Sequence, residues 1–334
     1  MSKKFFEPTP EMNQLLSRAG SLQREESLAA TSELAKALEL PLRQGVMSGN
    51  ILDGIFEAIN LQPGATAEFP LDFLAPGTEK EFVAFTIPNH GRIPERHVEG
   101  DYVMVPTYDV GASIDWLLKY ARDARWDVVG RAMDVLQGQF VKKMNDDGWH
   151  TLLSAGADRN ILIYDGDASS GMFSKRLVSL LKVVMRRNGG GNSTSINRGE
   201  LTDLYISPEG HEDIRNWGVD EVDPVTRRDL IVGEGGLLVR IFQVNLHTLD
   251  ELGEGQEYQN FYTTDLSGTM PAGKNEIVVG LDLRNNDSFV MPVRAPVQVF
   301  EDEALHRQRR AGMYGWAEHG FAALDTRRVL LGAF

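Results

Sequence analysis

The chain has 334 residues, 42% of them hydrophobic, which is enough for a substantial core divided among two or three domains. With 48 acidic and 34 basic residues it carries a net charge of −14, so wrapping or reading a nucleic acid backbone is excluded as its main task. It contains no cysteine, which excludes disulfides, thiolate metal sites and a cysteine nucleophile.

Residues 1–60 have the composition of an arm rather than of a domain. Glu7 and Pro8 arrive too early for a signal-peptide core, and no apolar run reaches the roughly 18 residues of a membrane span, so we expect a cytosolic protein. Leucines scattered among charged residues predict short helices that end at Pro41. Residues 51–59 predict a further short amphipathic turn. The whole segment needs a surface to dock on, either its own body or a neighbour.

From Thr66 to Thr107 the amino-acid composition becomes typical of strands and turns, which predicts an extended hairpin or long two-stranded ribbon. The predicted strands are 68–74, 81–87 and 101–105, separated by turns at 75–78 and 88–91. An isolated two-stranded ribbon is only marginally stable in water. This segment therefore also needs a surface to lie on.

The segment from Ile114 to Ser154 predicts one long helix. Its apolar residues recur at spacings of three and four and form one stripe: Val129, Ala132, Met133, Leu136, Phe140 and Met144. Ser113 is the expected N-cap and Gly156 the expected stop. Internal glycines weaken the pattern, so a break near Tyr120 or a bend near Gly138 stays open.

The remainder mixes strands and helices without regular alternation, which predicts the α+β class with no internal repeat. Ser207 and Pro208 predict the start of a helix that runs to Trp217. The other expected elements are a strand at 159–164, a helix at 173–187, a flexible loop at 188–193, a buried strand at 204–206, strands at 237–244, 258–263, 276–281, 289–293 and 297–300, and a C-terminal hairpin at 305–324.

The motifs that could carry chemistry all have a plainer interpretation. The glycine-rich loop lacks the lysine and hydroxyl of a phosphate-binding loop. Asp165-Gly166-Asp167 lacks calcium-loop spacing and predicts a solvated turn, and His211-Glu212-Asp213 cannot chelate one ion from a helix. His90 and His97 are not accompanied by the nucleophile-elbow motif that a catalytic triad would require. The basic run 307–310 predicts a salt-bridged sheet face. No catalytic residue, metal ligand or cofactor is predicted.

Two stretches resemble a known family. Residues 202–209 (TDLYISPE), running on to 213–217 (DIRNW), resemble the axial-domain strand and helix of major capsid proteins of tailed bacteriophages. The end of the chain, 306–316 (HRQRRAGMYGW) and 320–325 (GFAALD), is similar to the closing strands of that family. The order of elements agrees as well. The resemblance implies an α+β, HK97-like capsid fold with N-terminal arm, extended β-hairpin loop, long spine helix, and peripheral and axial domains.

The resemblance also implies a division of the chain and a set of contacts. The arm is residues 1–60, the extended loop 61–111, the peripheral domain 112–156 with 266–334, and the axial domain 157–265. The two ribbon turns supply the candidate intersubunit residues, namely Pro76, Gly77, Thr78, Glu79, Lys80, Asn89, His90 and Arg92. We do not predict the covalent cross-link that some members form from a loop lysine.

The function that this resemblance implies is structural. The chain is expected to self-assemble into pentamers and hexamers of an icosahedral phage head that encloses double-stranded DNA without sequence-specific binding. The implied partners are further copies of the chain, a separate scaffolding protein, a portal and cement proteins, with no membrane. The implied location is the virion, after assembly in the host cytoplasm, and the acidic wall repels packed DNA.

Two alternatives stay open from the sequence. An encapsulin-like nanocompartment shell would use the same fold around a cargo enzyme, and only its contents separate it from a viral head. A cytosolic α+β enzyme is supported only by length and by a flexible loop at Gly189–Gly191 that could act as a lid.

Overall fold

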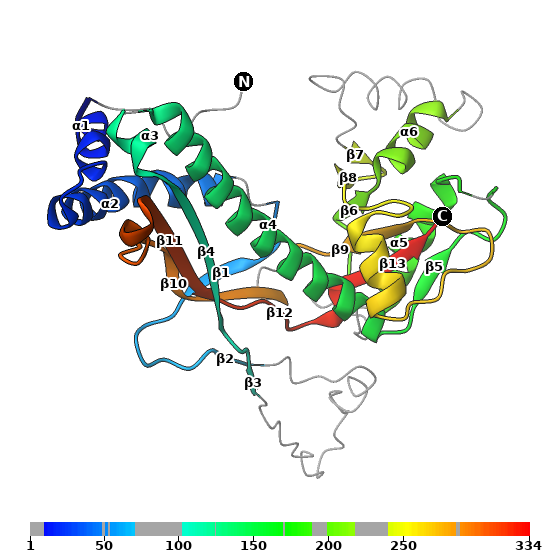
Figure 1. Cartoon of the computed structure of the whole chain (residues 1–334). Helices are drawn as coiled ribbons and strands as arrows, with labels where there is room; N and C mark the ends of the chain where they lie inside the picture. The colour runs from blue at the N-terminus through cyan, green and yellow to red at the C-terminus, as the bar shows by residue number, and fades with distance from the viewer. Residues whose placement is uncertain are drawn as a thin grey trace, which may run out of the picture. The chain divides into compact units, whose positions relative to one another are not determined.

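The computed structural model describes residues 10–48, 51–52, 54–70, 102–123, 125–169, 171–188, 199–217, 240–284 and 288–334. These residues divide between two compact units, which we describe in turn (Figure 1). The first lies within Met1–Ala67, Met104–Gly148 and Met291–Ala322, and the second within Glu68–Val103, Trp149–Val290 and Ala323–Phe334. Helices and strands are interspersed, which confirms the predicted α+β class.

The first unit is built on a five-stranded sheet. Its strands are β1 (Glu57–Asn60), β10 (Phe289–Glu301), β11 (Arg310–His319) and β4 (Tyr108–Leu117) in spatial order, with β12 (Ala322–Ala323) also paired to β10. Strand β11 pairs antiparallel with β4 along its whole length. The sequence predicted two strands where β10 is one. Pro296 lies within an irregularity of the β10–β11 register, because proline has no N–H to give to the ladder.

Three further predictions for the first unit were wrong in detail. The expected hairpin at 305–324 does not form. The segment begins with a 3-10 turn, η5 (Leu305–Gln308), and the strand after it, β11, pairs with β10 and β4. The amphipathic turn at 51–59 gives way to β1 at Glu57. Neither helix of the N-terminal segment ends at Pro41, which lies inside the second of them.

Helices α1 (Pro10–Ala19) and α2 (Arg24–Ser48) are longer than the predicted short helices, and α2 passes through Pro41. Proline costs one helical hydrogen bond, but the buried residues Leu34, Leu38, Leu42 and Val46 recur every four positions on both sides of it. Packing of this stripe offsets the lost bond. The pair docks on its own unit, since Gly20 lies against the backbone of Arg122 and Gly45 against Gln137.

The predicted long helix is α4 (Trp126–Asp158), preceded by a short α3 (Leu118–Arg122). The expected start was wrong: Ser113 lies in β4 opposite Tyr314, and the break falls after Arg122. The predicted stripe is buried from Val129 to Met144, apart from the partly exposed Ala132. Gly156 does not stop the helix. A Cβ there would lie 2.7 Å from Leu331 Cγ, so this glycine permits close packing instead.

The second unit contains a mixed six-stranded sheet. In spatial order its strands are β5 (Leu162–Tyr164), β13 (Val329–Ala333), β9 (Ile277–Leu281), β6 (Asp203–Ile206), β8 (Val244–Thr248) and β7 (Arg240–Ile241). The three central strands are buried at every position. The sequence missed β13 and grouped β9 and β13 with the peripheral domain, whereas both pair with strands of this unit. The division of the chain into the four parts of a shell subunit stays a prediction.

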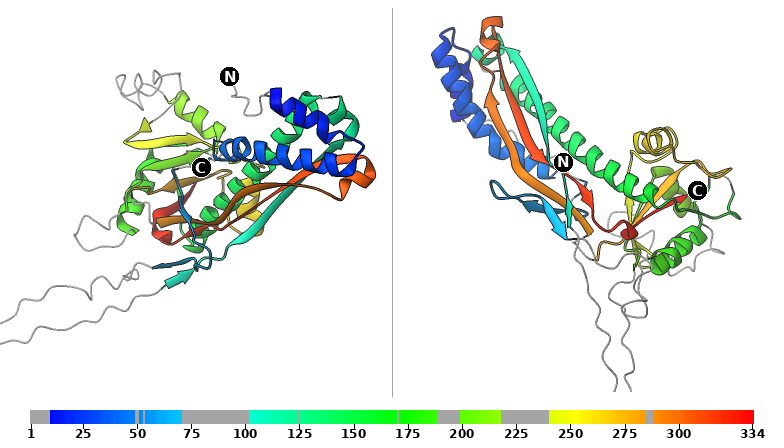
Figure 2. Two further views of the ribbon diagram at one scale, coloured as in Figure 1. Left: turned by 90° about the vertical axis from the view of Figure 1, so that its left-hand side faces the viewer. Right: turned by 90° about the horizontal axis from the view of Figure 1, so that it is seen from below.

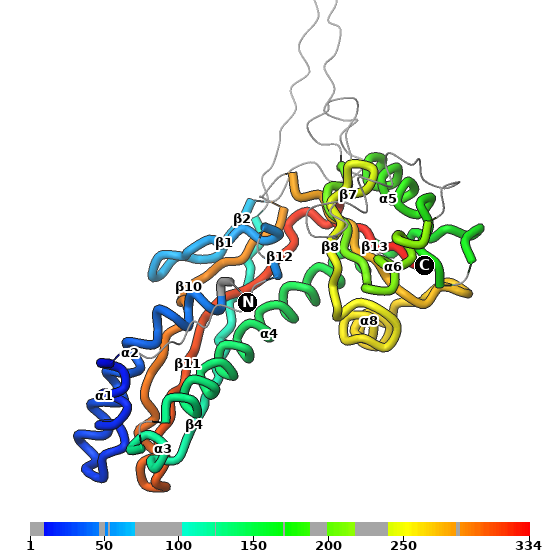
Figure 3. Tube along the Cα trace, turned by 90° about the horizontal axis from the view of Figure 1, so that it is seen from above, coloured from blue at the N-terminus to red at the C-terminus, as the bar shows by residue number. Residues whose placement is uncertain are grey.

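Opposite faces of this sheet carry different helices. Leu204 and Ile206 of β6 join the core formed with α5 (Lys175–Asn188) and α6 (Pro208–Asn216). Tyr205 points to the other face, because side chains alternate along a strand, and its ring contacts Trp149 at 4.8 Å between centroids. There α8 (Glu257–Asn260) and the π-helical turn η3 (Phe261–Asp265) pack. Figures 2 and 3 show α5 and α8 on opposite sides of the sheet.

Local sequence signals predicted the helices α5 and α6 of this unit correctly but two of its strands wrongly. Helices α5 and α6 are confirmed, and Ser207 Oγ accepts from Gly210 N at 3.1 Å as the predicted N-cap. The strand expected at 258–263 is instead α8 and η3. The strand expected at 237–244 is interrupted after β7 by a turn in which Phe242 and Gln243 have positive φ, and the chain then reverses into β8.

The base of the predicted ribbon is present as a two-stranded sheet of β2 (Glu68–Pro70) and β3 (Tyr102–Met104). Residues 71–101, which include the strand expected at 81–87, lie outside the described residues. Among the described helices, none is both long and apolar enough to cross a membrane.

Candidate functional site

The eight residues predicted to contact a neighbouring subunit cannot be placed. Pro76, Gly77, Thr78, Glu79, Lys80, Asn89, His90 and Arg92 all lie outside the described residues, so this assignment stays a prediction. The strands at the base of the same segment are described. There Tyr102 is 65% exposed and Met104 67% exposed, so two large apolar side chains face solvent where the segment begins.

The Asp165-Gly166-Asp167 turn is a structural cap rather than a metal loop. Asp165 is buried, and its carboxylate accepts from Ser174 Oγ at 2.6 Å and from the Asp167 N–H at 3.1 Å. The bond from Ser174 keeps the pKa of Asp165 below its ordinary value, although burial opposes this. Ser174 in turn accepts from Leu177 N and so caps α5. The turn positions the helix. Gly166 and Asp167 are exposed as predicted, whereas Asp165 is buried.

The histidines of the second unit form no catalytic constellation within the described part of the chain. His247 Nε2 lies 2.8 Å from Asp203 Oδ1, but no hydroxyl of a described residue hydrogen-bonds to that imidazole. His211 is buried on α6, where burial lowers its pKa. Searching the described residues finds no group of three or more His, Asp or Glu side chains that could hold a metal ion.

The basic run 307–310 is not the alternating sheet face that the sequence predicted. Arg307 lies in η5, and Arg309 adopts a left-handed conformation with φ of 56° as the chain turns into β11. Only Arg310 is in the strand, where its Nε lies 2.8 Å from Asp115 Oδ2 on β4. One of the expected salt bridges therefore exists, on the outward side of the sheet.

The outward face of the five-stranded sheet carries an aromatic cluster, which we define as Phe300, Tyr314 and Trp316. Phe300 is opposite Tyr314 in the β10–β11 register, and their rings stack at 5.6 Å. Phe300 also stacks on Trp316 at 6.4 Å. The intervening Gly315 points the other way, toward Phe140 of α4. Phe300 is 36% and Tyr314 40% exposed, so the aromatic cluster is open in one chain.

A hydrogen-bond network fixes the opposite face of this sheet to α4. Tyr108 Oη of β4 donates to Asp147 Oδ2 at 2.8 Å, and Lys143 Nζ lies 2.7 Å from Asp147 Oδ1. Burial and the neighbouring Asp147 raise the pKa of Tyr108, so the phenol stays protonated. His319, whose ring centroid is 5.5 Å from that of Tyr108, has its pKa lowered by burial. This face is a packed interior, and the free surface is the outward one.

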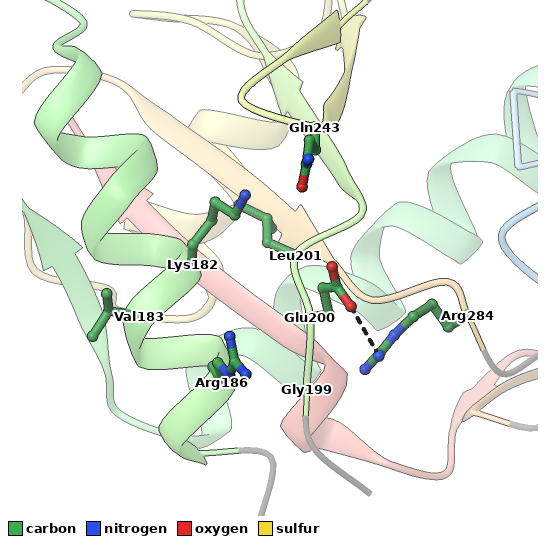
Figure 4. A pocket seen from close by; sticks show the side chains of 8 residues that line it. All are labelled: Lys182, Val183, Arg186, Gly199, Glu200, Leu201, Gln243 and Arg284. Atoms are coloured by element: carbon green, nitrogen blue, oxygen red, sulfur yellow. Dashed lines mark hydrogen bonds and ion pairs between the residues drawn. The ribbon is translucent and has the colours of Figure 1, made fainter. Parts of the chain in front are cut away.

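The second unit has a basic pocket of about 510 Å³, which Figure 4 shows between α5 and the segment that leads into β6. Lys182 and Arg186 project from α5 on one side, and Glu200, Gln243 and Arg284 line the other. Arg284 is held by Glu200 at 3.0 Å and by Asp282 at 3.0 Å. The wall therefore has three cations against one anion, and it is suited to a negatively charged partner.

Comparisons with known proteins identify the fold. The sequence matches no family model and no curated protein. The structure is similar to a chain of Microbacterium phage Oxtober96, with 10% identity and a TM-score of 0.59 over 86% of this chain and 90% of that chain. It is also similar to the capsid of an empty GTA particle, with 12% identity and a TM-score of 0.54 over 86% and 90%.

A third likeness is to the capsid of cyanophage P-SCSP1u, with 12% identity and a TM-score of 0.52 over 85% of this chain and 88% of that chain. All three likenesses extend over most of the chain. The chain therefore shares the fold of these structures, which is the predicted HK97-like fold.

Sequence reasoning missed both surfaces described above. The signal for the aromatic cluster is the alternation Arg310, Gly312, Tyr314, Trp316, which places two large rings on one side of a strand. The signal for the basic pocket is a helix that carries five basic residues and no acid, between Lys175 and Asn188. Each is visible in the sequence, but neither matches a catalytic motif.

Proposed function

We propose that this chain is the major capsid protein of a tailed bacteriophage, a structural subunit without catalytic activity. It self-assembles into pentamers and hexamers of an icosahedral head that encloses double-stranded DNA. The observation that carries this proposal is the likeness of some 85% of the chain to phage and GTA capsid structures. Its location is then the virion, after assembly in the host cytoplasm, and its further partners are a separate scaffolding protein, a portal and cement proteins.

The parts of the chain have corresponding roles in the proposal. Residues 1–60 are the arm, residues 61–111 the extended loop, residues 112–156 and 266–334 the peripheral domain and residues 157–265 the axial domain. Two strands from the peripheral range, β9 and β13, complete the sheet that contains β6 of the axial domain. The loop assignment is supported by the pairing of β2 with β3 at its base. The candidate contacts of the loop are the turns at Pro76–Lys80 and at Asn89–Arg92.

Burial of apolar surface between copies supplies the driving force. The aromatic cluster and the exposed Tyr102 and Met104 leave apolar area in water in a single chain. Burying apolar surface gains about 25 cal/mol per Å², less the entropy of fixing the subunits. Because the contacts join different surfaces of identical chains, they can repeat around a ring and close. The net charge of −14 then disfavours tight binding of the enclosed DNA.

The mass and shape of the purified protein test this proposal. Light scattering on a sizing column, followed by negative-stain electron microscopy, is expected to find shells, or pentamers and hexamers of the 37.1 kDa chain. A chain that stays monomeric at every concentration and with its scaffold present contradicts the proposal. Shells that protect DNA from nuclease support a viral head, whereas shells filled with an enzyme identify the encapsulin-like alternative.

A further inference from the structure

Helix α5 has one strongly basic face. Between Lys175 and Asn188 the chain has five lysines and arginines and no acidic residue, although the whole protein carries a net charge of −14. Leu177, Leu181 and Met185 are fully buried in the core of the second unit. The opposite side of the helix is exposed, so its charges face solvent and not the protein interior.

The cations at the C-terminal end of α5 differ from those nearer its start. Arg176 pairs with Asp165 and Asp167, and Lys182 Nζ donates to Phe242 O at 2.6 Å. Arg186 and Arg187 are exposed, and no carboxylate of a described residue forms an ion pair with either guanidinium. Arg186 also lines the basic pocket. These two arginines are therefore available to an external anion.

The second unit also has an acidic loop, which we define as residues 249–256 between β8 and α8. From Ile241 to Gly273 the chain has five acidic residues and no lysine or arginine. Within the loop, Asp250 and Glu254 are exposed. Gly253 of this loop lies against Ser207 and Glu209, which follow β6, whereas the C-terminal end of α5 lies against Gly199, which precedes β6. The loop and the Arg186–Arg187 end of α5 are therefore at opposite ends of β6.

The acidic loop is held in a defined shape. Gly253 and Gly255 have φ of 129° and 78°, values that side chains other than glycine rarely adopt. Tyr258 N donates to Glu251 O at 3.1 Å, and Gln256 N to Gly253 O at 3.1 Å. Burial raises the pKa of Glu276, and the charges of Glu209 and Asp213 on α6 and of Glu254 in the loop raise it further. The loop therefore presents a fixed negative surface.

Opposite charges at the two ends of one unit are complementary between copies. We infer that the Arg186–Arg187 end of α5 in one subunit docks on the acidic loop of a second copy, at Asp250 and Glu254. Such a contact joins two different surfaces, so it repeats from copy to copy and can close a ring. This inference rests on the proposed function and specifies which surfaces of the second unit meet within a pentamer or hexamer. A nucleic acid strand is the alternative occupant of the basic face.

Charge reversal of each surface in the full-length chain tests the contact. The variants are Arg186→Glu with Arg187→Glu, and Asp250→Lys with Glu254→Lys, compared by the fraction of protein that sediments as assembled particles. Each pair places like charges at the contact, so we expect the assembled fraction to fall by about tenfold or more. Combining all four substitutions restores opposite charges and is expected to restore assembly. Circular dichroism verifies that each variant is folded.

A mixture of the two reversed variants gives a second readout. If they alternate around an even-numbered ring, every contact again joins opposite charges, so co-expression is expected to restore hexamers that neither variant forms alone. The control is Arg125→Glu with Arg131→Glu, two exposed arginines of the first unit whose reversal changes the net charge equally. This control is expected to assemble like the wild type.

Each outcome decides between interpretations. If the wild type assembles and the folded α5 variant assembles equally well, the inferred contact is wrong while the proposed function stands. The inferred contact is also wrong if neither the four-fold variant nor the mixture regains assembly. It is wrong as well if the control variant loses as much assembly as the α5 variant. Normal shells that lose their nuclease-protected DNA would assign the basic face to nucleic acid and overturn the inference. A wild-type chain that never assembles contradicts the proposed function itself.

Discussion

Arg328 and Asp282 form a buried ion pair in the second unit, with Arg328 Nη1 donating to Asp282 Oδ2. Their side chains are 5% and 1% exposed. Asp282 also accepts from Arg284 Nε and from Glu200 N, and Arg328 Nε lies 3.3 Å from Asp325 Oδ2. The pair therefore fixes the segment before β13 to the end of β9, although 46 residues separate the two side chains in the chain.

Replacing Asp282 by Asn is expected to destabilise the subunit by about 3 to 5 kcal/mol at pH 7, because it leaves Arg328 buried without its main counter-charge. Burial raises the pKa of Asp282, but the hydrogen bonds and charges of Arg284 and Arg328 outweigh it and hold the pKa below its ordinary value. A folded-state pKa below the unfolded value of about 3.9 gives stability that is complete above that pH and is lost as pH falls through the folded pKa.

The difference in unfolding free energy between wild type and Asp282→Asn should therefore narrow as pH falls below about 4. Urea unfolding of the unassembled subunit at a series of pH values measures it. Asp127→Asn, at an exposed position on α4, is the matched control and should change stability by at most about 0.5 kcal/mol. A pH-independent difference would mean that the Asp282 carboxylate does not act through its charge.

Two glycines of the first unit make a matched pair with opposite expected effects. Gly138 lies within α4, and a Cβ there would meet no atom within 4 Å, so Gly138→Ala should stabilise the subunit by about 0.5 to 1 kcal/mol. At Gly20 a Cβ would lie 2.2 Å from Arg122 N, so Gly20→Ala should destabilise it by about 1 to 3 kcal/mol.

Urea unfolding of the unassembled subunit measures both alanine variants on the same scale. Because the substitution is chemically the same, the difference in unfolding free energy between the two variants reports on the packing of the end of α1 against the end of α3. A Gly20→Ala variant as stable as wild type would show that this close approach is not required.

The parts of the fold that the sequence predicted are those with a strong local signal. The stripe from Val129 to Met144 identified α4, and Ser207 with Pro208 identified the start of α6. The errors occur where tertiary packing overrides the local signal. Pro41 should end a helix but is carried within α2, and Gly156 should end α4 but gives room to Leu331.

The surfaces were less predictable than the elements. Tyr314 and Trp316 alternate in the sequence, but their role as an open face depends on which side of the sheet α4 covers, and that is a non-local fact. Strand β13 was missed because Val329–Ala333 is too short and too uniformly apolar to show a period. Opposite charges on α5 and on the acidic loop are plain in the sequence, but their placement at opposite ends of β6 depends on the folded sheet.

The aromatic cluster provides a test that separates folding from assembly. Phe300→Ser with Tyr314→Ser removes a stacked but exposed pair, so the unfolding free energy of the subunit should fall by only about 1 to 2 kcal/mol. If copies bury this face, the assembled fraction in a sedimentation assay should fall by at least about tenfold. Val135→Ser, at an exposed apolar site of α4, is the control. Full assembly of the double variant would exclude the aromatic cluster as a contact.

Deleting Pro76–Lys80 tests the extended-loop assignment that the resemblance implies. The deletion should leave a folded subunit, because the sheets and helices that the structure describes lie elsewhere in the chain. It should also reduce assembly by at least about tenfold, because a shortened loop cannot reach the adjacent copy. Circular dichroism and sedimentation measure the two effects. A second variant with the same five residues replaced by glycine and serine keeps the length, so it separates reach from side-chain contact. Normal shells from the deletion would contradict the assignment.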